Sequence, residues 1–299
     1  MLKYKQPMKK NNAIINIFCS ISSNRLKEVN RLLIPSLEKQ AINYPIHLSL
    51  IEYTGTKTFS RKDIIGNNLK LNILYPSKPL GFGEAHNYAF NKISPKNYFL
   101  IVNSDIYLDK HCIKNLVNTF NPAKGLIEAR QIPFAHPKDS PQEKPFETNW
   151  ASGSCLLINS KFFKKVNGFD PNYWMYLEDV DLSWKSWING YSVIHNPEAI
   201  AYHYTGLYFK YTDNSYQLEH FWSIRNFLYI SYIYFGNKGL NRAYKMVKNS
   251  PIDKNLVSET IANFIKLKDS SKLKQIKIPK ELRDRIKIYG LNKFSRYPL

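Results

Sequence analysis

The sequence predicts an α/β fold, in which a mainly parallel sheet is flanked by helices and followed by a basic helical region. Three observations predict it. Apolar strand-like segments alternate with helix-like segments between residues 14 and 120. Hydrophobic residues make up 43% of the 299 residues, which is enough for a sizeable core. From Leu240 onward the chain becomes basic, with 15 Lys or Arg against 5 Asp or Glu.

The first half of the chain supplies the alternation. Its helix-like segment 25–40 carries Leu26, Val29 and Leu33 at helical spacing, whereas the segment 98–102 is a short continuous apolar run. The remaining expected strands are 14–21, 46–53 and 69–75, and the remaining expected helices are 84–92 and 110–120. This order indicates a doubly wound parallel sheet, which binds ligands at the carboxyl ends of its strands.

The second half is less regular. Residues 121–146 are rich in Pro, Lys and Gln, and we expect a long loop at the rim of a site. A strand is expected over 150–159, then a helix that Ser160 caps, and an aromatic helix over 218–235. Pro279 is expected to separate two C-terminal helices. We therefore divide the chain into a domain at 1–236 and a basic helical region at 237–299.

The charge and the cysteines restrict the function and the compartment. A formal net charge of +20 predicts an anionic partner, which is a nucleic acid, an acidic membrane surface or a phosphate-rich substrate. Three widely spaced cysteines fit a reducing compartment better than a disulfide framework or a zinc site. The short apolar run at 13–21 is interpreted as a strand, not a signal peptide, and no run approaches the length of a membrane span. We therefore expect a cytoplasmic protein, soluble or peripheral to a membrane.

Asn103, Ser104 and Asp105 directly follow the buried-looking strand 98–102. An aspartate at such a strand end can hold Mg²⁺ or Mn²⁺ against a diphosphate, because both cations prefer oxygen ligands. The alternative is that Asp105 only caps the helix that begins near Lys110.

Three acids lie close together at Glu178, Asp179 and Asp181. At the start of a helix, the first and third of them share a face while Asp179 points elsewhere, so one carboxylate can face a pocket and act as a general base. The alternative is that all three only complement the positive N-terminus of the helix.

Two further features are weaker when taken alone. His203 ends a strand-like run and is either a metal ligand or a satisfied core histidine. Gly81 and Gly83 flank a strand-to-helix turn that precedes Asn87. The backbone N–H groups of this turn could face an anion. The turn is not a dinucleotide fingerprint, because the third glycine of that motif is absent. Gly153 is expected where the backbone approaches a ligand.

In this order the segments resemble the family 2 inverting nucleotide-sugar glycosyltransferases, which have the Rossmann-like GT-A fold, and in particular their rhamnosyltransferase-like branch. The segment 103–105 is similar to the DxD-type motif of that family, and 168–182 is similar to its GFD…EDVDL block. The segment 190–203 resembles its closing segment, and Arg225-Asn226 its RN helix. The resemblance spans 13–235.

The resemblance implies roles for individual residues. Asp105 and His203 would bind a Mg²⁺ or Mn²⁺ ion. The residues around the nucleotide-sugar donor would be Asn103, Ser104, Asn87, Gly81, Gly83 and Glu52. On the acceptor side, Asp179 would be the catalytic base, with Glu178 and Asp181 beside it. Gly153, Trp174 and Tyr176 would contact the acceptor. Glu52 departs from the family, which usually has an Asp-Asn-x-Ser-type turn here.

The implied reaction transfers rhamnose, a hexose or an N-acetylhexosamine from a UDP- or dTDP-sugar, with inversion, to a hydroxyl of a bacterial cell-surface glycan or lipid-linked acceptor. Lipopolysaccharide is one such glycan. The basic region would then hold the enzyme at the anionic inner face of the cell membrane. One alternative is a nucleic-acid-binding protein that uses this basic region, although no nucleic-acid-binding motif is present. Another is an inactive homologue that only binds a nucleotide sugar.

Overall fold

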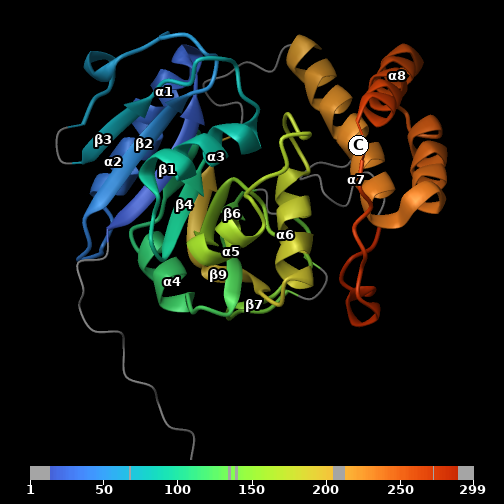
Figure 1. Ribbon diagram of the computed structural model, residues 1–299. Coiled ribbons are helices and arrows are strands. Elements are labelled where there is room, and N and C mark those ends of the chain that lie inside the picture. The colour runs from blue at the N-terminus through green and yellow to red at the C-terminus, as the bar shows by residue number, and fades with distance from the viewer. Residues whose placement is uncertain are drawn as a thin grey trace, which may run out of the picture.

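The computed structural model describes residues 14–66, 69–133, 136–138, 141–204, 213–271 and 273–288, without the side chains of 213–216. Its centre is a nine-stranded sheet in the order β3-β2-β1-β4-β8-β6-β9-β5, with β7 paired to β9. Helices cover both faces of this sheet, and α7 and α8 lie to one side of it (Figure 1). The predicted α/β fold is thus confirmed.

One half of the sheet is parallel, as expected. It comprises β1 (Ile15–Ile21), β2 (Ile46–Glu52), β3 (Lys70–Leu74) and β4 (Tyr98–Val102). All five residues of β4 are buried, because helices cover both faces and leave no solvent side for polar residues. The four predicted strands are confirmed to within one or two residues at each end.

The helices of this half also lie where they were predicted. The first is interrupted, with α1 (Leu26–Glu28), a π-helical turn (Val29–Leu33) and α2 (Ile34–Glu38) in succession. The others are α3 (Phe82–Ile93) and α4 (Cys112–Thr119).

The other half of the sheet is mixed. It comprises β5 (Ile106–Leu108), β6 (Lys124–Ile132), β7 (Phe146–Glu147), β8 (Cys155–Asn159) and β9 (Ser192–His203). β8 is antiparallel to both β4 and β6, whereas β6 is parallel to β9. β5 and β7 are antiparallel to β9.

Three predictions for this half were wrong. The strand expected over 150–159 begins only at Cys155, as β8. Residues 124–132 are not a loop but β6, which lies between β8 and β9 in the sheet. The pattern hid this strand because it carries Glu128 and Gln131, which are buried and have polar partners. The cap of α5 (Ser160–Lys165) is Asn159, whose side chain accepts hydrogen bonds from the N–H groups of Lys161 and Phe162.

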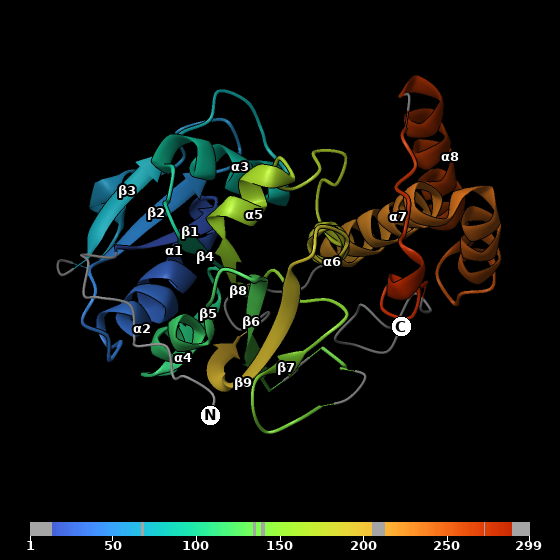
Figure 2. The ribbon, with the colours of Figure 1, turned by 60° about the horizontal axis from the view of Figure 1, so that its bottom comes forward.

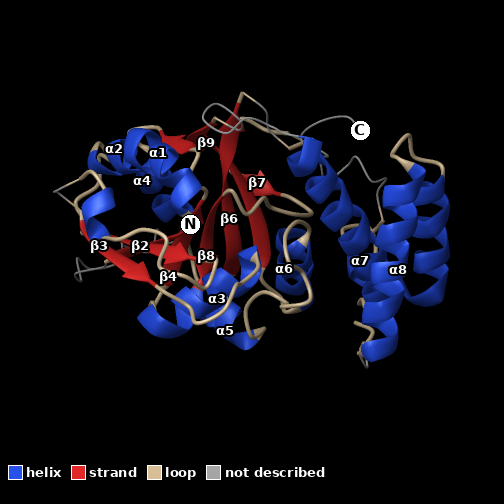
Figure 3. Ribbon diagram, turned by 90° about the horizontal axis from the view of Figure 1, so that it is seen from above, coloured by secondary structure: helices blue, strands red, loops and turns tan. Residues whose placement is uncertain are grey.

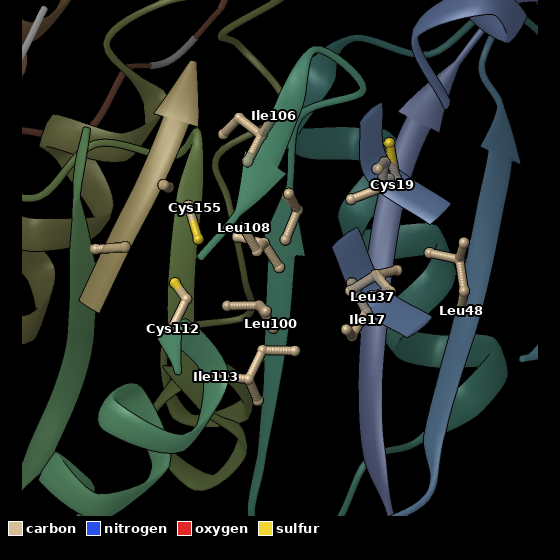
Figure 4. Close-up of a cluster of buried hydrophobic side chains, with 14 of the residues drawn as sticks. Ile17, Cys19, Leu37, Leu48, Leu100, Ile106, Leu108, Cys112, Ile113 and Cys155 are labelled. Carbon is tan, nitrogen blue, oxygen red and sulfur yellow. The ribbon is translucent and has the colours of Figure 1, made fainter. Parts of the chain in front are cut away.

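Apolar side chains fill the space beneath the helices on one face of the sheet. Ile17, Leu48, Leu100 and Ile113 belong to this cluster, which joins β1, β2, β4 and α4 (Figure 4). Two of the three free cysteines, Cys112 and Cys155, face each other in it. A hydrogen bond between these thiols, together with burial, holds the pKa of Cys112 well above its usual range.

α6 (Glu178–Ile188) lies between the sheet and the C-terminal helices α7 (Asp213–Lys248) and α8 (Lys254–Ser270), as Figures 2 and 3 both show. α7 is kinked at Gly236, whose φ of 60° is in the left-handed region. Only a short 3₁₀ turn, Lys280–Leu282, occupies the described part of the helix expected after Pro279. The described chain contains no helix with both the length and the apolar character needed to span a membrane.

Candidate active site

Asp105 and His203 lie side by side at one end of the sheet. β5 and β9 pair with Ile106 opposite His203, which places the residue before β5 against the histidine. Both side chains are buried, and the distance from His203 Nε2 to Asp105 Oδ1 is 3.1 Å. The other ring nitrogen, Nδ1, lies 2.8 Å from Oε1 of Gln131 on β6. That amide oxygen can accept only a ring N–H, so it favours the tautomer that leaves Nε2 available toward Asp105.

This pair has the donor atoms for a hard divalent cation. Among the described residues, no cluster of three or more His, Cys, Asp or Glu forms a metal site. The protein ligands that this pair offers to a cation are thus limited to one carboxylate, from Asp105, and one imidazole, from His203. Mg²⁺ and Mn²⁺ fit such a small protein contribution when substrate phosphates and water complete their coordination.

The turn that carries Asp105 is fixed from two sides. Ser104 Oγ donates a hydrogen bond of 2.7 Å to Glu28 on α1, and Glu28 pairs with Arg25 at 2.7 Å. The N–H of Asn103 donates to the carbonyl of Ser154, just before β8. Burial raises the pKa of Glu28, whereas Ser104 and Arg25 lower it. Ser104 thus anchors the turn through its side chain.

Asp179 is the least buried of the three acids in the first turn of α6. Its Oδ2 accepts the N–H of Gly153 at 2.8 Å, and its Oδ1 accepts the N–H of Val180 at 2.8 Å. Burial raises the pKa of Asp179 to about 6, although the two N–H groups favour its charged form. A carboxylate held in one orientation, with a pKa near neutrality, is suited to general base catalysis.

The two neighbouring acids are in different environments. Asp181 is fully buried; its carboxylate lies 2.6 Å from Lys185 Nζ and accepts a hydrogen bond of 2.9 Å from the hydroxyl of Tyr234 on α7. It therefore joins α6 to α7. Burial and the charge of Asp179 hold the pKa of the buried Glu178 well above its usual range. Its side chain contacts the start of α3, where a Cβ at Gly83 would lie 3.7 Å from Glu178 Cγ.

Trp174 and Tyr176 belong to the loop before α6, which is held by its backbone carbonyls. The carbonyl of Trp174 accepts the N–H of Phe82 at the start of α3. The carbonyls of Met175 and Tyr176 accept two hydrogen bonds, of 2.7 and 2.8 Å, from the Asn226 side chain on α7. Tyr176 and the following Leu177 both have positive φ, 72° and 66°. Such strain persists only where the surroundings enforce it.

Three residues expected around the donor have backbone roles in this structure. The Asn87 side chain exchanges hydrogen bonds of 2.8 and 2.9 Å with the carbonyl and N–H of Phe169, so both ends of the amide are in use. Gly81 and Gly83 allow close packing, because their Cβ atoms would lie 2.4 Å from the Trp174 carbonyl and 2.7 Å from Phe169 Cβ. The N–H of Phe82 is taken by the carbonyl of Trp174, so it is not among the groups of this turn that could face an anion.

Glu52 likewise organises its own turn. It is fully buried and accepts hydrogen bonds from the side chains of Thr54 and Thr58 and from the N–H of Thr56. The carboxylate therefore shapes residues 53–58 and is not directed to solvent.

A buried polar cluster near Asp179 was not predicted from the sequence. Glu128 on β6 lies 2.5 Å from Lys138 Nζ and 2.5 Å from His195 Nδ1 on β9. Burial alone would raise the pKa of Glu128, but Lys138 and His195 lower it to about 2. No spacing rule could find this cluster, since its members come from two strands and a connecting segment. Gln131, behind His203, was missed for the same reason.

No protein-family model matches the chain. Over 64 residues it is 42% identical to an N-acetylglucosaminyl-diphospho-decaprenol L-rhamnosyltransferase of Mycobacterium tuberculosis, and over 56 residues 39% identical to the rhamnosyltransferase WbbL of Escherichia coli. These matches cover 21% and 19% of this chain, and only about a fifth of each relative, 20% and 21%.

Solved structures match most of the chain. S. aureus TarS 1-349 superimposes with a TM-score of 0.52 over 86% of this chain and 72% of its own, at 15% identity. The mannosyltransferase PcManGT of Pyrobaculum calidifontis, in complex with GDP-Man and Mn²⁺, gives 0.54 over 88% and 76%, at 12% identity. GalNAc-T7 with UDP, GalNAc and Mn²⁺ gives 0.60 over 86% and 55%, at 11% identity. The chain therefore has the GT-A fold, and part of its sequence is similar to rhamnosyltransferases.

Proposed function

We propose that this protein is an inverting glycosyltransferase that moves a sugar from a nucleoside diphosphate sugar to a hydroxyl of a lipid-linked or cell-surface glycan. The observation that carries the proposal is Asp179, a partly accessible carboxylate with a raised pKa, held in one orientation by Gly153. The GT-A fold and the local similarity to rhamnosyltransferases support the reaction class.

The donor would lie at the end of the sheet that carries Asp105 and His203. These two residues would hold Mg²⁺ or Mn²⁺, which supplies positive charge to the departing diphosphate. Gln131 orients the His203 ring for this task, and Ser104 fixes the turn through Glu28. UDP and dTDP are the nucleotides we propose for the donor.

The acceptor would approach Asp179. As the acceptor oxygen attacks the anomeric carbon from the side opposite the leaving diphosphate, Asp179 takes the hydroxyl proton. One bond to the anomeric carbon forms while the bond to the diphosphate breaks, so the configuration inverts. The 174–177 loop fixes the start of α6 and hence the base, so positioning supplies part of the rate.

A donor and metal panel tests the proposal. UDP- and dTDP-sugars, dTDP-rhamnose among them, are incubated with a polyprenyl-diphosphate-linked N-acetylglucosamine acceptor in Mn²⁺, Mg²⁺ or EDTA. We expect transfer from one donor and loss of transfer in EDTA. If no donor supports transfer, and oligonucleotides instead raise the melting temperature, the results would favour a nucleic-acid-binding protein.

The variant Asp179→Asn separates the base from the donor site. We expect a fall of about 10²–10⁴-fold in kcat, the usual contribution of a general base. Donor affinity, measured by calorimetry, should stay unchanged because Asp179 is assigned to the acceptor side. Unchanged turnover would overturn the assignment, and donor binding by a wild-type protein without turnover would favour an inactive homologue.

We also propose that residues 237–299 bring the enzyme to an anionic membrane surface. This region carries exposed lysines on and after α8, among them Lys254, Lys266, Lys274 and Lys277. Each basic residue near anionic lipid contributes about 1 kcal/mol. Flotation with phosphatidylglycerol vesicles, but not with phosphatidylcholine vesicles, should recover the protein, and Lys266→Glu with Lys274→Glu and Lys277→Glu should weaken recovery. Equal recovery with both lipids would contradict this role.

A further inference from the structure

Glu128 and Asp179 hold two consecutive N–H groups of the same backbone segment. Glu128 Oε2 accepts the N–H of Ser152, and Asp179 Oδ2 accepts the N–H of Gly153. The two N–H groups belong to neighbouring planar peptide groups joined at the Cα of Ser152, so fixing one of them restricts where the other can lie. The carboxylate of Glu128 on β6 thus helps to fix the hydrogen-bond donor to Asp179.

Lys138 completes this arrangement from the segment between β6 and β7. Its side chain is only 5% exposed, and its Nζ lies 2.5 Å from Glu128 and 3.1 Å from the carbonyl of Trp150. It also lies 4.6 Å from the centre of the Trp150 ring. Since a buried ammonium without an anion is costly, this segment is held against residues 150–153 by the ion pair.

We propose that the Glu128–Lys138 ion pair is a positioning device for the reaction, which holds residues 150–153 against Asp179 and balances the charge beside the base. The proposal rests on the proposed glycosyltransferase function, in which Asp179 takes the acceptor proton. Neither Glu128 nor Lys138 is assigned a contact with substrate.

Opposite charges from this pair act on Asp179. Beyond the effect of burial, Glu128 raises the pKa of Asp179 and Lys138 lowers it. The other acids near Asp179 are Glu178 and Asp181 on α6 itself, while the segment before β8 contributes the uncharged N–H of Gly153. Removing one partner of the pair should therefore shift the ionisation of Asp179 in the direction that the remaining charge dictates.

The test is the pH dependence of kcat for two opposed variants. The acidic limb of this profile is the rise in kcat as Asp179 loses its proton. In Lys138→Met the remaining Glu128 anion disfavours a negative charge on Asp179, so the acidic limb should move to higher pH. In Glu128→Gln the remaining Lys138 cation favours the Asp179 carboxylate, so the limb should move to lower pH. Each shift should be about 1 pH unit, the lower end of what a nearby charge produces.

Three further variants exclude a general loss of folding. Lys138→Arg keeps the charge and should retain the wild-type limb, and the double variant Glu128→Gln with Lys138→Met should return it close to the wild-type position. Lys144→Met removes an exposed lysine of the same segment and should change nothing. Shifts of both single variants in the same direction, or no shift in either, would overturn the proposal.

A measurement without substrate separates this proposal from the proposed function. The ¹³C carboxyl resonance of Asp179, assigned by its loss in Asp179→Asn, is titrated in wild type and in both single variants. Opposite shifts of its midpoint support the positioning device even if no donor is turned over. Unchanged midpoints in an active enzyme contradict the device and leave the glycosyltransferase reaction intact.

Discussion

Three carboxylates within one helical turn have three different environments in this protein. Asp179 is partly accessible and accepts two backbone N–H groups, Asp181 is fully buried between Lys185 and Tyr234, and Glu178 is buried against the start of α3. Their different surroundings, not their residue type, separate a base from structural acids. The i, i+3 spacing predicted that Asp179 points away from the other two, but it could not predict which acid is paired.

The raised pKa of Asp179 makes stability depend on pH. An acid whose folded pKa is about 6, above its unfolded value near 4, costs stability once it is ionised in the folded state. That cost is fully present above pH 6 and disappears as the pH falls below the unfolded pKa. Asn has one oxygen for the two N–H groups, so Asp179→Asn loses one hydrogen bond at every pH. Its urea midpoint relative to that of wild type should nevertheless be higher at pH 8 than at pH 4. A constant difference would contradict the raised pKa.

Asp181 should be required for folding stability rather than for the proton transfer. Asp181→Ala leaves Lys185 without its anion and should lower the free energy of unfolding by about 3 kcal/mol, as loss of one partner of a buried pair does. Urea denaturation measures the loss. The matched control is Lys287→Met, which breaks the exposed pair with Asp284 and should change stability by less than about 0.5 kcal/mol.

At the scale of elements, the base depends on the loop before α6. Asn226 is fully buried and holds the carbonyls of Met175 and Tyr176, so it keeps two consecutive left-handed residues in place. Most strands and helices of the first half could be predicted because apolar runs and helical spacing agree there. β6 could not, since a central strand with a buried glutamate looks like a loop when its partners Lys138 and His195 are unknown.

Asn226→Ala should loosen this loop. Two hydrogen bonds to carbonyls are lost, so stability should fall by about 1–3 kcal/mol. The acceptor KM should rise more than the donor KM, because the 174–177 loop is assigned to the acceptor side. Initial-rate kinetics with both substrates measure this split, and Asn91→Ala on the exposed face of α3 is the control. An equal rise in both KM values would argue against the assignment.

At the scale of the whole molecule, apolar packing crosses the proposed domain boundary at residue 236. One apolar cluster includes Val180 and Trp184 of α6, Phe227 of α7 and Phe264 of α8, so it spans the proposed boundary at residue 236. Arg285 reaches back to Glu147 at 2.5 Å and lies over the ring of Trp187. Composition indicated the boundary from the rise in basic residues, but charge on a surface says nothing about which apolar residues lie beneath it.

Unfolding experiments test the division at residue 236. Phe264 is fully buried, and Phe264→Ala should cost about 3–5 kcal/mol. If residues 237–299 form a separate unit, two calorimetric transitions should appear and this variant should move only one of them, while Leu100→Ala in β4 moves the other. If the cluster makes the chain a single cooperative unit, both variants shift one common transition. The second outcome would contradict the division.

The loop before α6 has a mechanical consequence for the molecule. Three successive carbonyls, those of Trp174, Met175 and Tyr176, are bonded to α3 on one side and to α7 on the other. The start of α6 is thus hydrogen-bonded, through the loop before it, to both α3 and α7, which belong to different parts of the fold. α7 cannot translate relative to α3 unless these bonds break or Asp179 moves with it, so a load applied to the C-terminal helices is transmitted to the position of the base.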